Sequence, residues 1–289
     1  MRRGIYGHHR KNQIKILRYR DNRFFKKFKI NQPLANIHPN AQIGTGVIIE
    51  PFATVSDDVI IGDGTYIGPT AVILPGCRIG KNCKIHSGAV IGGEPQDLKF
   101  KGEYTTVEIG DNTTIRECVT VNRGTAAHGK TVIGSNCLIM AYVHVAHDCV
   151  VGDSVILVNS VALAGEVIVD DFAIIGGHTG IHQFCHIGKH VMLSGGSLVR
   201  KDVPPYIKAG REPLSYAGVN SIGLRRRGFS NEVICQIQDI YRIIYQKGYN
   251  NSQALEVIEA EMQASRERDE ILLFLKDSKR GIIKGYFPD

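Results

Sequence analysis

The chain has 289 residues and 43% of them are hydrophobic, so it can bury a sizeable core in one large domain or two smaller ones. No run approaches the ~18 to 20 apolar residues of a membrane span, and no apolar stretch of a signal peptide follows the charged N-terminus. Composition therefore argues against stable membrane insertion and predicts a cytoplasmic protein.

The net charge of +7 comes from the N-terminal segment. Residues 1–30 contain 11 Lys and Arg against one acid, Asp21, and the remainder has 24 basic against 27 acidic side chains. We expect residues 1–36 to be a basic extension that is disordered or non-native. The alternative is contact with nucleic acid, phospholipid or an acidic protein. The slightly acidic body argues against a nucleic-acid-binding protein.

Aliphatic residues recur at every sixth position from residue 37 onward. Neither a 3.6-residue helical period nor an alternating strand gives this repeat, whereas a triangular coil with three six-residue sides does. The period predicts a left-handed parallel β-helix over 37–204 with these side chains inside. The 25 positions are Ile37, Ile43, Ile49, Val55, Ile61, Ile67, Ile73, Ile79, Ile85, Ile91, Ile109, Ile115, Val121, Ile133, Ile139, Val145, Val151, Leu157, Leu163, Val169, Ile175, Ile181, Ile187, Leu193 and Val199.

Two interruptions of the period, near 92–108 and 122–132, are predicted to protrude as loops, where binding residues tend to lie on a rigid solenoid. Glycine often follows the inward residue, which we interpret as a corner with unusual backbone angles. These glycines are Gly44, Gly62, Gly68, Gly80, Gly110, Gly134, Gly152, Gly176 and Gly188.

Five cysteines lie two positions before an inward aliphatic residue, where other coils carry Ala, Val, Thr or Ser. We therefore interpret them as small packing residues. A metal site or disulfides are the alternative, but no CxxC motif occurs and the cytoplasm is reducing. These cysteines are Cys77, Cys83, Cys137, Cys149 and Cys185.

After Pro204–Pro205 the pattern changes, which predicts a C-terminal α-helical domain over 205–289. The clearest helix spans 231–247, with Ser230 as its N-cap and Gly248 as its stop. Two more helices are expected at 252–264 and 268–278. Such a segment would cover the open last coil of the prism.

Residues 18 apart stack in successive coils, so His147, Gly165 and Gln183 should form one column with steps of ~4.8 Å. Asp148 and Glu166 belong to the neighbouring column. An imidazole can remove a hydroxyl proton, a carboxylate can orient it, and a backbone N–H can stabilise an oxyanion. These groups suit direct acyl transfer, and the alternative is a solvated polar face.

Several stretches make the chain resemble the UDP-N-acetylglucosamine O-acyltransferases, which begin lipid A synthesis. The resemblance covers nearly everything after residue 36. It is much more specific than the hexapeptide repeat, which many acyltransferases share. The matching stretches are GGEPQDLKFKGE at 92–103, RECVTVNRGT at 116–125, HVAHDC at 144–149, DDFAIIGG and IHQFCHIG within 170–188, DVPPY at 202–206 and GVNSIGLRRRGFS at 218–230.

The resemblance implies transfer of an (R)-3-hydroxyacyl chain from acyl carrier protein to the 3-hydroxyl of UDP-N-acetylglucosamine. It implies His147 as general base, Asp148 as its orienting group and the Gly165 backbone as oxyanion donor, without a metal or a resident cofactor. It also implies a homotrimer with active sites between subunits. The implied substrate contacts are Asp97, Lys99, His144, His182, Gln183, Asn220, Arg226 and Arg227, the implied floor of the acyl groove is Gly195, and reasonable contacts for the carrier protein are Lys201, Lys208 and Arg211.

The chain departs from the family pattern at three positions. Glu166 replaces a common His, Ile222 replaces a Glu of the nucleotide pocket, and Asn122 replaces the His of an HRGT motif. Glu166 beside Asp148 is expected to raise the pKa of a carboxylate or of His147. The sequence does not determine the length of the acyl chain.

Four rival functions remain. They are the related N-acyltransferase of the same pathway, a coenzyme A-dependent acetyltransferase, a zinc-dependent hydratase and a non-catalytic solenoid scaffold. The PQDLKFKGE and RRRGFS segments argue against the first two. His144 and His147 lack a convincing third ligand for zinc.

Overall fold

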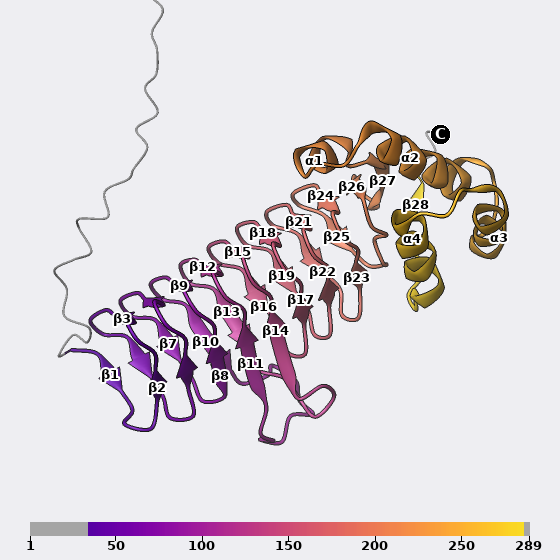
Figure 1. Ribbon diagram of the computed structural model, residues 1–289. Coiled ribbons are helices and arrows are strands. Elements are labelled where there is room, and N and C mark those ends of the chain that lie inside the picture. The colour runs from indigo at the N-terminus through magenta and orange to yellow at the C-terminus, as the bar shows by residue number, and fades with distance from the viewer. Residues whose placement is uncertain (1–33, 286–289) are drawn as a thin grey trace, which may run out of the picture.

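A computed structural model describes residues 34–285. Its short strands wind into a triangular prism, and four helices lie at the C-terminal end (Figure 1). The left-handed parallel β-helix predicted from the six-residue period is confirmed. The basic extension predicted over 1–36 falls almost entirely outside the described residues.

Three sheets form the sides of the prism, with nine, eight and eleven strands within residues 34–285, and every pairing is parallel except one near the C-terminal end of the third sheet. The first sheet contains β1 (Asn36–Ile37), β4 (Thr54–Val55), β7 (Val72–Ile73), β10 (Val90–Gly93), β13 (Thr120–Asn122), β16 (His144–Val145), β19 (Ala162–Leu163), β22 (Gly180–Ile181) and β25 (Leu198–Val199). The second contains β2 (Gln42–Ile43), β5 (Ile60–Ile61), β8 (Cys77–Ile79), β11 (Thr106–Ile109), β14 (Lys130–Ile133), β17 (Val150–Val151), β20 (Ile168–Val169) and β23 (His186–Ile187). The third contains β3 (Ile48–Ile49), β6 (Tyr66–Ile67), β9 (Lys84–Ile85), β12 (Thr114–Ile115), β15 (Leu138–Ile139), β18 (Ile156–Leu157), β21 (Ile174–Ile175), β24 (Met192–Leu193), β26 (Ile207–Gly210), β27 (Ser215–Val219) and β28 (Lys284–Gly285).

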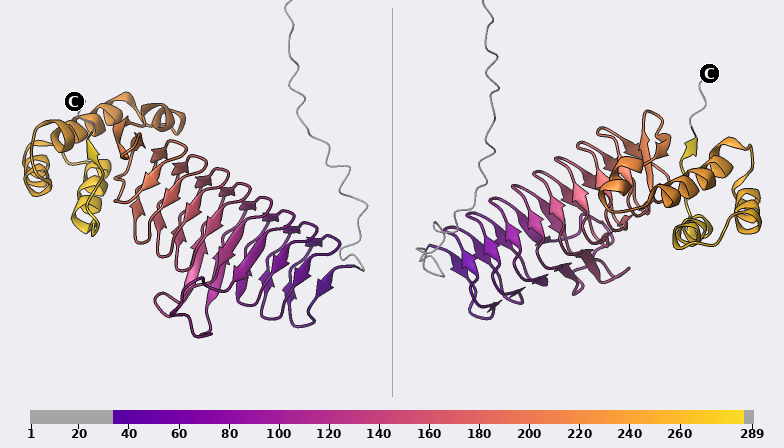
Figure 2. Two further views of the ribbon diagram at one scale, coloured as in Figure 1. Left: turned by 180° about the vertical axis from the view of Figure 1, so that it is seen from behind. Right: turned by 45° about the horizontal axis from the view of Figure 1, so that its top comes forward.

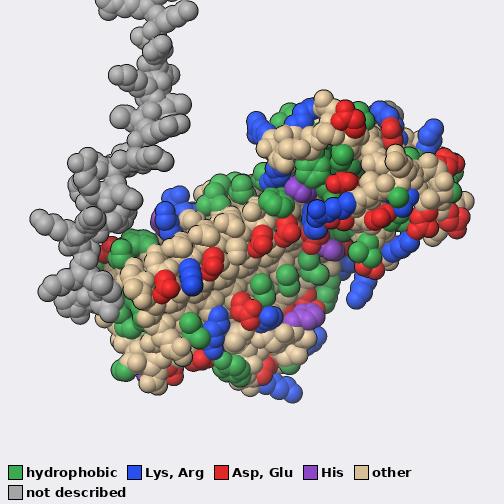
Figure 3. All heavy atoms as spheres, viewed as in Figure 1, with side chains coloured by type: hydrophobic (Ala, Val, Ile, Leu, Met, Phe, Trp, Pro, Cys, Tyr) green, Lys and Arg blue, Asp and Glu red, His purple; other side chains and the backbone are tan. Residues whose placement is uncertain are grey.

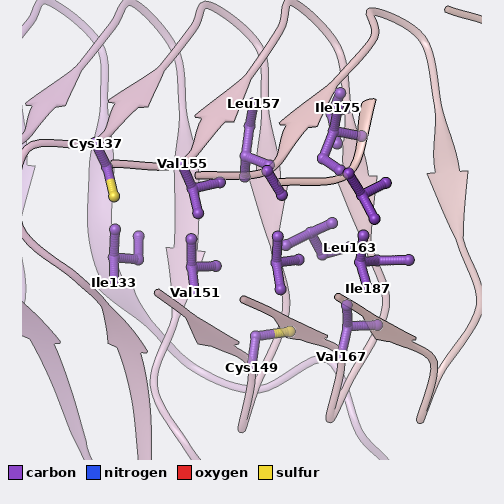
Figure 4. Packing of buried hydrophobic residues seen from close by; sticks show 14 of the residues in the cluster. Ile133, Cys137, Cys149, Val151, Val155, Leu157, Leu163, Val167, Ile175 and Ile187 are labelled. Carbon is purple, nitrogen blue, oxygen red and sulfur yellow. The ribbon is translucent and has the colours of Figure 1, made fainter. Parts of the chain in front are cut away.

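The predicted aliphatic positions form the interior of the prism. All are buried except Ile37 and Ile43, which belong to the first described coil and are partly buried against the core. Successive coils place aliphatic residues directly above one another, as Figure 4 shows for part of the core. Each fully buried aliphatic side chain contributes roughly 1.5–3 kcal/mol relative to an exposed one.

The five cysteines of the repeat are free and buried, as predicted. Cys137 and Cys149 point into the interior beside Val155 and Val167 (Figure 4). Burial raises the pKa of Cys77 and of Cys149 to about 12, so both remain protonated thiols near neutral pH. They act as packing residues.

The interpretation of the nine corner glycines is wrong in its physical reason. Each of them has an ordinary negative φ, whereas positive φ values occur three residues after the inward position, as at Asn82 and Asp148. The glycines are instead required by close stacking of the coils. A Cβ atom on Gly62 would lie 2.6 Å from the carbonyl carbon of Gly80, in the next coil. At Gly62 the next coil therefore leaves no room for a side chain.

Both predicted loops leave the corner between the first and second sheets and project from the prism beside β11 and β14 (Figure 1). They are shorter than expected, spanning 94–105 and 123–129, because β10, β11, β13 and β14 extend into them. Ile91 pairs with Val121 and Ile109 pairs with Ile133, so neither insertion breaks the inward pattern. The loops enlarge one corner without disturbing the core.

The segment after Pro204–Pro205 does not turn directly into helices, contrary to expectation. β26 first pairs in parallel with β24 and then antiparallel with β27, so the third sheet continues beyond the last coil. The four helices follow, packed at this end of the prism (Figure 2). They are α1 (Ser221–Arg226), α2 (Asn231–Gln246), α3 (Asn251–Glu261) and α4 (Arg266–Asp277).

The predicted helices correspond to α2, α3 and α4, and Ser230 caps α2 as expected, by accepting a hydrogen bond from Val233 N. Tyr241 on α2 is fully buried and donates to Pro205 O at 2.6 Å. Its ring stacks with the ring of Tyr216 on β27 at a centroid distance of 5.6 Å. This contact joins the helices to the last coils. The domain boundary between 204 and 205 itself stays a prediction.

Replacing Gly62 with Ala should lower the free energy of unfolding by roughly 2–4 kcal/mol, because the added methyl would meet only backbone atoms of the next coil. Gly180→Ala is the matched control, since its Cβ would contact only Leu198 Cδ2 at 3.7 Å. Urea unfolding of both variants measures the difference. Equal stability of the two variants would contradict the stacking argument.

Candidate functional site

The predicted column of His147, Gly165 and Gln183 is present at the corner that follows the first sheet. These residues lie just after β16, β19 and β22, in successive coils. They line a groove of about 580 Å³ together with His144 and His182. Along the first sheet the groove is lined by His144, Ala162, Gly180 and Leu198, which occupy equivalent positions in successive coils.

His147 and Asp148 form a buried pair. His147 Nδ1 lies 2.8 Å from Asp148 Oδ2, and only 7% of His147 and 2% of Asp148 are exposed. Because the carboxylate bonds Nδ1, that nitrogen carries the proton and Nε2 is left as the free acceptor. The geometry therefore suits a base whose working atom is Nε2.

The second loop holds the Asp148 carboxylate. Thr125 donates from Oγ1 to Oδ2 at 2.7 Å and from its N–H to Oδ1 at 3.0 Å, and the N–H of His128 adds a bond at 3.3 Å. Burial pushes the pKa of Asp148 upward, but the hydrogen bonds from Thr125 and His147 outweigh it and hold the pKa below its usual value. Asp148 is thus kept ionised beside the imidazole.

Gly165 is required by the imidazole of His147. A Cβ atom at residue 165 would lie 2.5 Å from Cε1 and 2.6 Å from Nε2 of that ring. The backbone of Gly165 therefore approaches the nitrogen that is free to act. Its N–H donates to no protein acceptor among residues 34–285 and remains available to a ligand.

Two further predicted histidines flank this pair. His144 Nδ1 lies 2.7 Å from Thr120 Oγ1, and burial lowers the pKa of His144. His182 is exposed at the groove, with Nδ1 at 3.1 Å from Gln183 O. The structure thus brings five predicted site residues into one groove: His144, His147, Gly165, His182 and Gln183.

The Glu166 carboxylate forms no hydrogen bond or ion pair with His147 or Asp148 within the described residues. Its carboxylate turns to His128 Nε2 at 3.4 Å and to Gln183 Nε2 at 3.5 Å, away from Asp148. The pKa of Asp148 is lowered rather than raised. The departure at 166 therefore replaces a common His by a carboxylate that contacts the second loop.

The first loop reaches the groove through Gln96. Asp97 Oδ1 accepts from Lys99 N at 2.9 Å, so the Asp97 carboxylate caps its own turn, and Lys99 is exposed. Asn122 fastens this loop by donating to Glu94 O at 2.7 Å. The departure at 122 therefore joins the two loops.

The remaining predicted contacts lie at other corners of the prism. Asn220 is buried, caps α1 and donates to His190 O at 2.9 Å. Arg227 lies against His190 and Phe172, next to the corner after the second sheet. Arg226 is exposed on α1, as is Ile222. One chain does not bring these residues to His147.

Gly195 follows β24 of the third sheet and also lies outside the groove that contains His147. A Cβ atom at this position would lie 3.1 Å from Gly177 O, in the preceding coil. Its assignment to an acyl groove stays a prediction.

A second groove of about 820 Å³ is lined by four basic residues, Arg200, Lys201, Arg211 and Lys284, and by one acidic residue, Glu212. It meets the first groove at Leu198 and Arg200. Two of the three predicted carrier-protein contacts, Lys201 and Arg211, thus share one basic surface. Lys208 is exposed on β26, outside this groove.

Three further observations concern metal binding, membrane insertion and surface charge. No group of three or more His, Cys, Asp or Glu residues that could hold a metal is found within 34–285. No helix in that range is long and apolar enough to cross a membrane. On the face shown in Figure 3, basic and acidic side chains are interspersed.

Sequence reasoning missed the residues that support Asp148. Thr125 lies within the quoted RECVTVNRGT stretch, so its place in an interruption of the repeat was an available signal. Thr131 Oγ1, which accepts from Asp148 N at 2.8 Å, and the backbone donor of His128 lie in the same interruption but outside the quoted stretch.

Comparison with known proteins places this chain in a family. A family model described as Udp N-acetylglucosamine O-acyltransferase, domain 2, matches residues 202–283, and a bacterial transferase hexapeptide model matches 58–93 and 130–165. An acyl-(acyl-carrier-protein)–UDP-N-acetylglucosamine O-acyltransferase of Thiobacillus denitrificans is 46% identical over 70% of this chain and 78% of its own length. Its counterpart in Herminiimonas arsenicoxydans is 44% identical over 71% and 80%.

Solved structures agree. A UDP-N-acetylglucosamine acyltransferase from Bacteroides fragilis superposes with a TM-score of 0.86 at 55% identity, covering 88% of this chain and 100% of that one. LpxA from Acinetobacter baumannii gives 0.86 at 40% identity, with 89% and 100% covered. The chain belongs to the UDP-N-acetylglucosamine O-acyltransferase family.

Proposed function

We propose that this protein transfers an (R)-3-hydroxyacyl chain from acyl carrier protein to the 3-hydroxyl of UDP-N-acetylglucosamine, the first step of lipid A synthesis. One observation carries the mechanism: Asp148 bonds Nδ1 of His147, while the Gly165 backbone faces the free Nε2 in the groove. The phosphopantetheine belongs to the donor substrate, so it is not a resident cofactor.

In the proposed reaction, His147 Nε2 removes the proton of the sugar 3-hydroxyl as its oxygen attacks the thioester carbon. The Gly165 N–H donates to the oxyanion that forms. Collapse of this intermediate breaks the C–S bond, and protonated His147 returns the proton to the leaving thiolate. Asp148 stabilises the imidazolium between these two steps. The reaction needs no covalent enzyme intermediate.

The nucleotide is proposed to bind between subunits of a homotrimer. His144, His182 and Gln183 lie in the groove, whereas Asn220 and Arg226 lie at another corner of the same prism. Two sets of residues on different corners can form one site when prisms pack side by side. In this proposal Asp97 and Lys99 of the first loop contact the sugar, and Arg226 and Arg227 bind the diphosphate.

The acidic carrier protein is proposed to dock on the basic groove, with Lys201 and Arg211 among its contacts. This groove meets the His147 groove at Leu198, so a bound pantetheine arm has a continuous path to the base. Lys208 is on a separate surface and is the weakest of the three contacts. A cytoplasmic location fits this donor and stays a prediction.

A non-catalytic scaffold is the alternative from a different class. It would not require Gly165 to make room for the imidazole, nor three donors from one loop on Asp148. The related N-acyltransferase would attach the chain to an amine rather than a hydroxyl. Whether the product carries the acyl chain on oxygen or on nitrogen therefore distinguishes the two enzymes.

His147→Ala should reduce kcat by at least about 1,000-fold, because it removes the base and the proton donor to the thiolate. UDP-N-acetylglucosamine should bind with nearly unchanged affinity. Steady-state assays and calorimetric titration measure these quantities. His178→Ala is the matched control, since His178 is an exposed histidine on the same prism outside the groove. Full activity of the His147 variant would refute the mechanism.

Thr125→Val should raise the pKa of Asp148, because it removes the hydroxyl that donates to the carboxylate. A carboxylate with a lowered folded pKa stabilises the fold above its unfolded value of ~3.9, and this contribution disappears as pH falls through the folded pKa. The variant should therefore be less stable than the wild type at pH 7 and close to it near pH 2. Unfolding free energies across this range test the sign, and a difference independent of pH would contradict it.

A further inference from the structure

His190 occupies the centre of an aromatic cluster outside the His147 groove. It lies in the corner between β23 and β24 and is 8% exposed. Phe172 stacks on one side of the imidazole at a centroid distance of 4.9 Å, and Tyr206 on the other at 5.5 Å. Phe229 packs edge-on at 5.1 Å. The ring is therefore held in one orientation.

Two of the residues assigned to the nucleotide contact His190 directly. Asn220 Nδ2 donates to the His190 carbonyl at 2.9 Å, and Arg227 Nη1 lies 3.3 Å from His190 Nδ1. The guanidinium also lies over the ring of Phe172, with Cζ 5.1 Å from its centroid. One residue of the prism thus holds both ends of α1.

The contact with Arg227 determines which ring nitrogen of His190 carries the proton. A guanidinium has only N–H donors, so Nδ1 of His190 must accept and the proton of the neutral ring must lie on Nε2. Burial, then the positive charge of Arg227, lowers the pKa of His190 to about 4. Lys189 and Arg266 act in the same direction and Glu270 opposes them. His190 is therefore neutral near pH 7.

We propose that His190 is a positioning residue for nucleotide binding, which acts by accepting a hydrogen bond from Arg227 at Nδ1 and fixing the guanidinium toward the diphosphate. Arg227 has further N–H groups for phosphate oxygens. Without this acceptor, the Arg227 side chain would sample other rotamers. Nucleotide binding would then have to fix the side chain, at a cost in conformational entropy. The inference rests on the proposed function, since it takes UDP-N-acetylglucosamine as the ligand.

His190→Phe tests the inference because it keeps an aromatic ring in the stack and removes the acceptor. We expect the Kd and the KM for UDP-N-acetylglucosamine to rise about tenfold, with kcat nearly unchanged. His190→Gln, which offers an amide oxygen, should recover part of the affinity. His178→Phe is the control for replacing a histidine of the prism with phenylalanine. An unchanged Kd in His190→Phe would overturn the proposal.

A double-variant comparison separates positioning from a general structural effect. If His190 acts through Arg227, adding His190→Phe to an Arg227→Met variant should change the Kd for UDP-N-acetylglucosamine little. An equal loss of affinity from His190→Phe in the wild type and in the Arg227→Met variant would overturn the inference. Lack of UDP-sugar binding by the wild type would instead contradict the proposed function.

The wild-type protein provides a measurement that does not depend on how a variant folds. Nitrogen-15 NMR distinguishes the two neutral tautomers of histidine. A proton on Nε2 of His190 at pH 7 is the expected result, and a proton on Nδ1 would exclude the bond from Arg227.

Discussion

Parallel hydrogen bonding between successive coils is the constraint on which the rest of this molecule depends. Val145 pairs with Leu163, which pairs with Ile181, so each coil repeats the side-chain directions of the one before. The same spacing that stacks aliphatic residues inside also requires glycine at positions such as Gly62, where the next coil leaves no room for a Cβ. On the outside it aligns His147 with the backbone of Gly165.

The site gains its chemistry where that repetition is interrupted. A regular corner would leave His147 and Asp148 on an open surface. The loop over 123–129 covers this corner and supplies three of the donors that hold the Asp148 carboxylate. The rigid prism fixes the positions of the residues, and the inserted loop provides the electrostatic environment.

The fold was largely predictable because a six-residue period requires a particular coil. Stacking of residues 18 apart also predicted that His147 and Gly165 would meet. Contacts across the insertions could not be predicted, since the repeat says nothing about where Thr125 or His128 would lie. The glycines were identified correctly but explained by backbone angles, because the distance between coils is a tertiary property.

The C-terminal region shows the limit of pattern reasoning most clearly. Helix α2 follows from amphipathic spacing and its Ser230 cap, and two further helices were expected where α3 and α4 lie, but β26 and β27 lack the six-residue period and were missed. Asn220 and Arg227 were assigned by resemblance alone, which does not show that they lie at a different corner from His147. Their joint contact with His190 depends on β-helix and helical segments that are far apart in sequence.

The central claim is direct transfer of a hydroxyacyl chain to a sugar hydroxyl at the His147 groove. Mass spectrometry of the products is the most direct test, after the purified, metal-stripped protein is incubated with UDP-N-acetylglucosamine and a ladder of 3-hydroxyacyl carrier proteins. The account predicts a single O-acylated sugar nucleotide, whose mass also identifies the preferred chain length. The absence of product from every donor, or a chain attached to nitrogen, would contradict it.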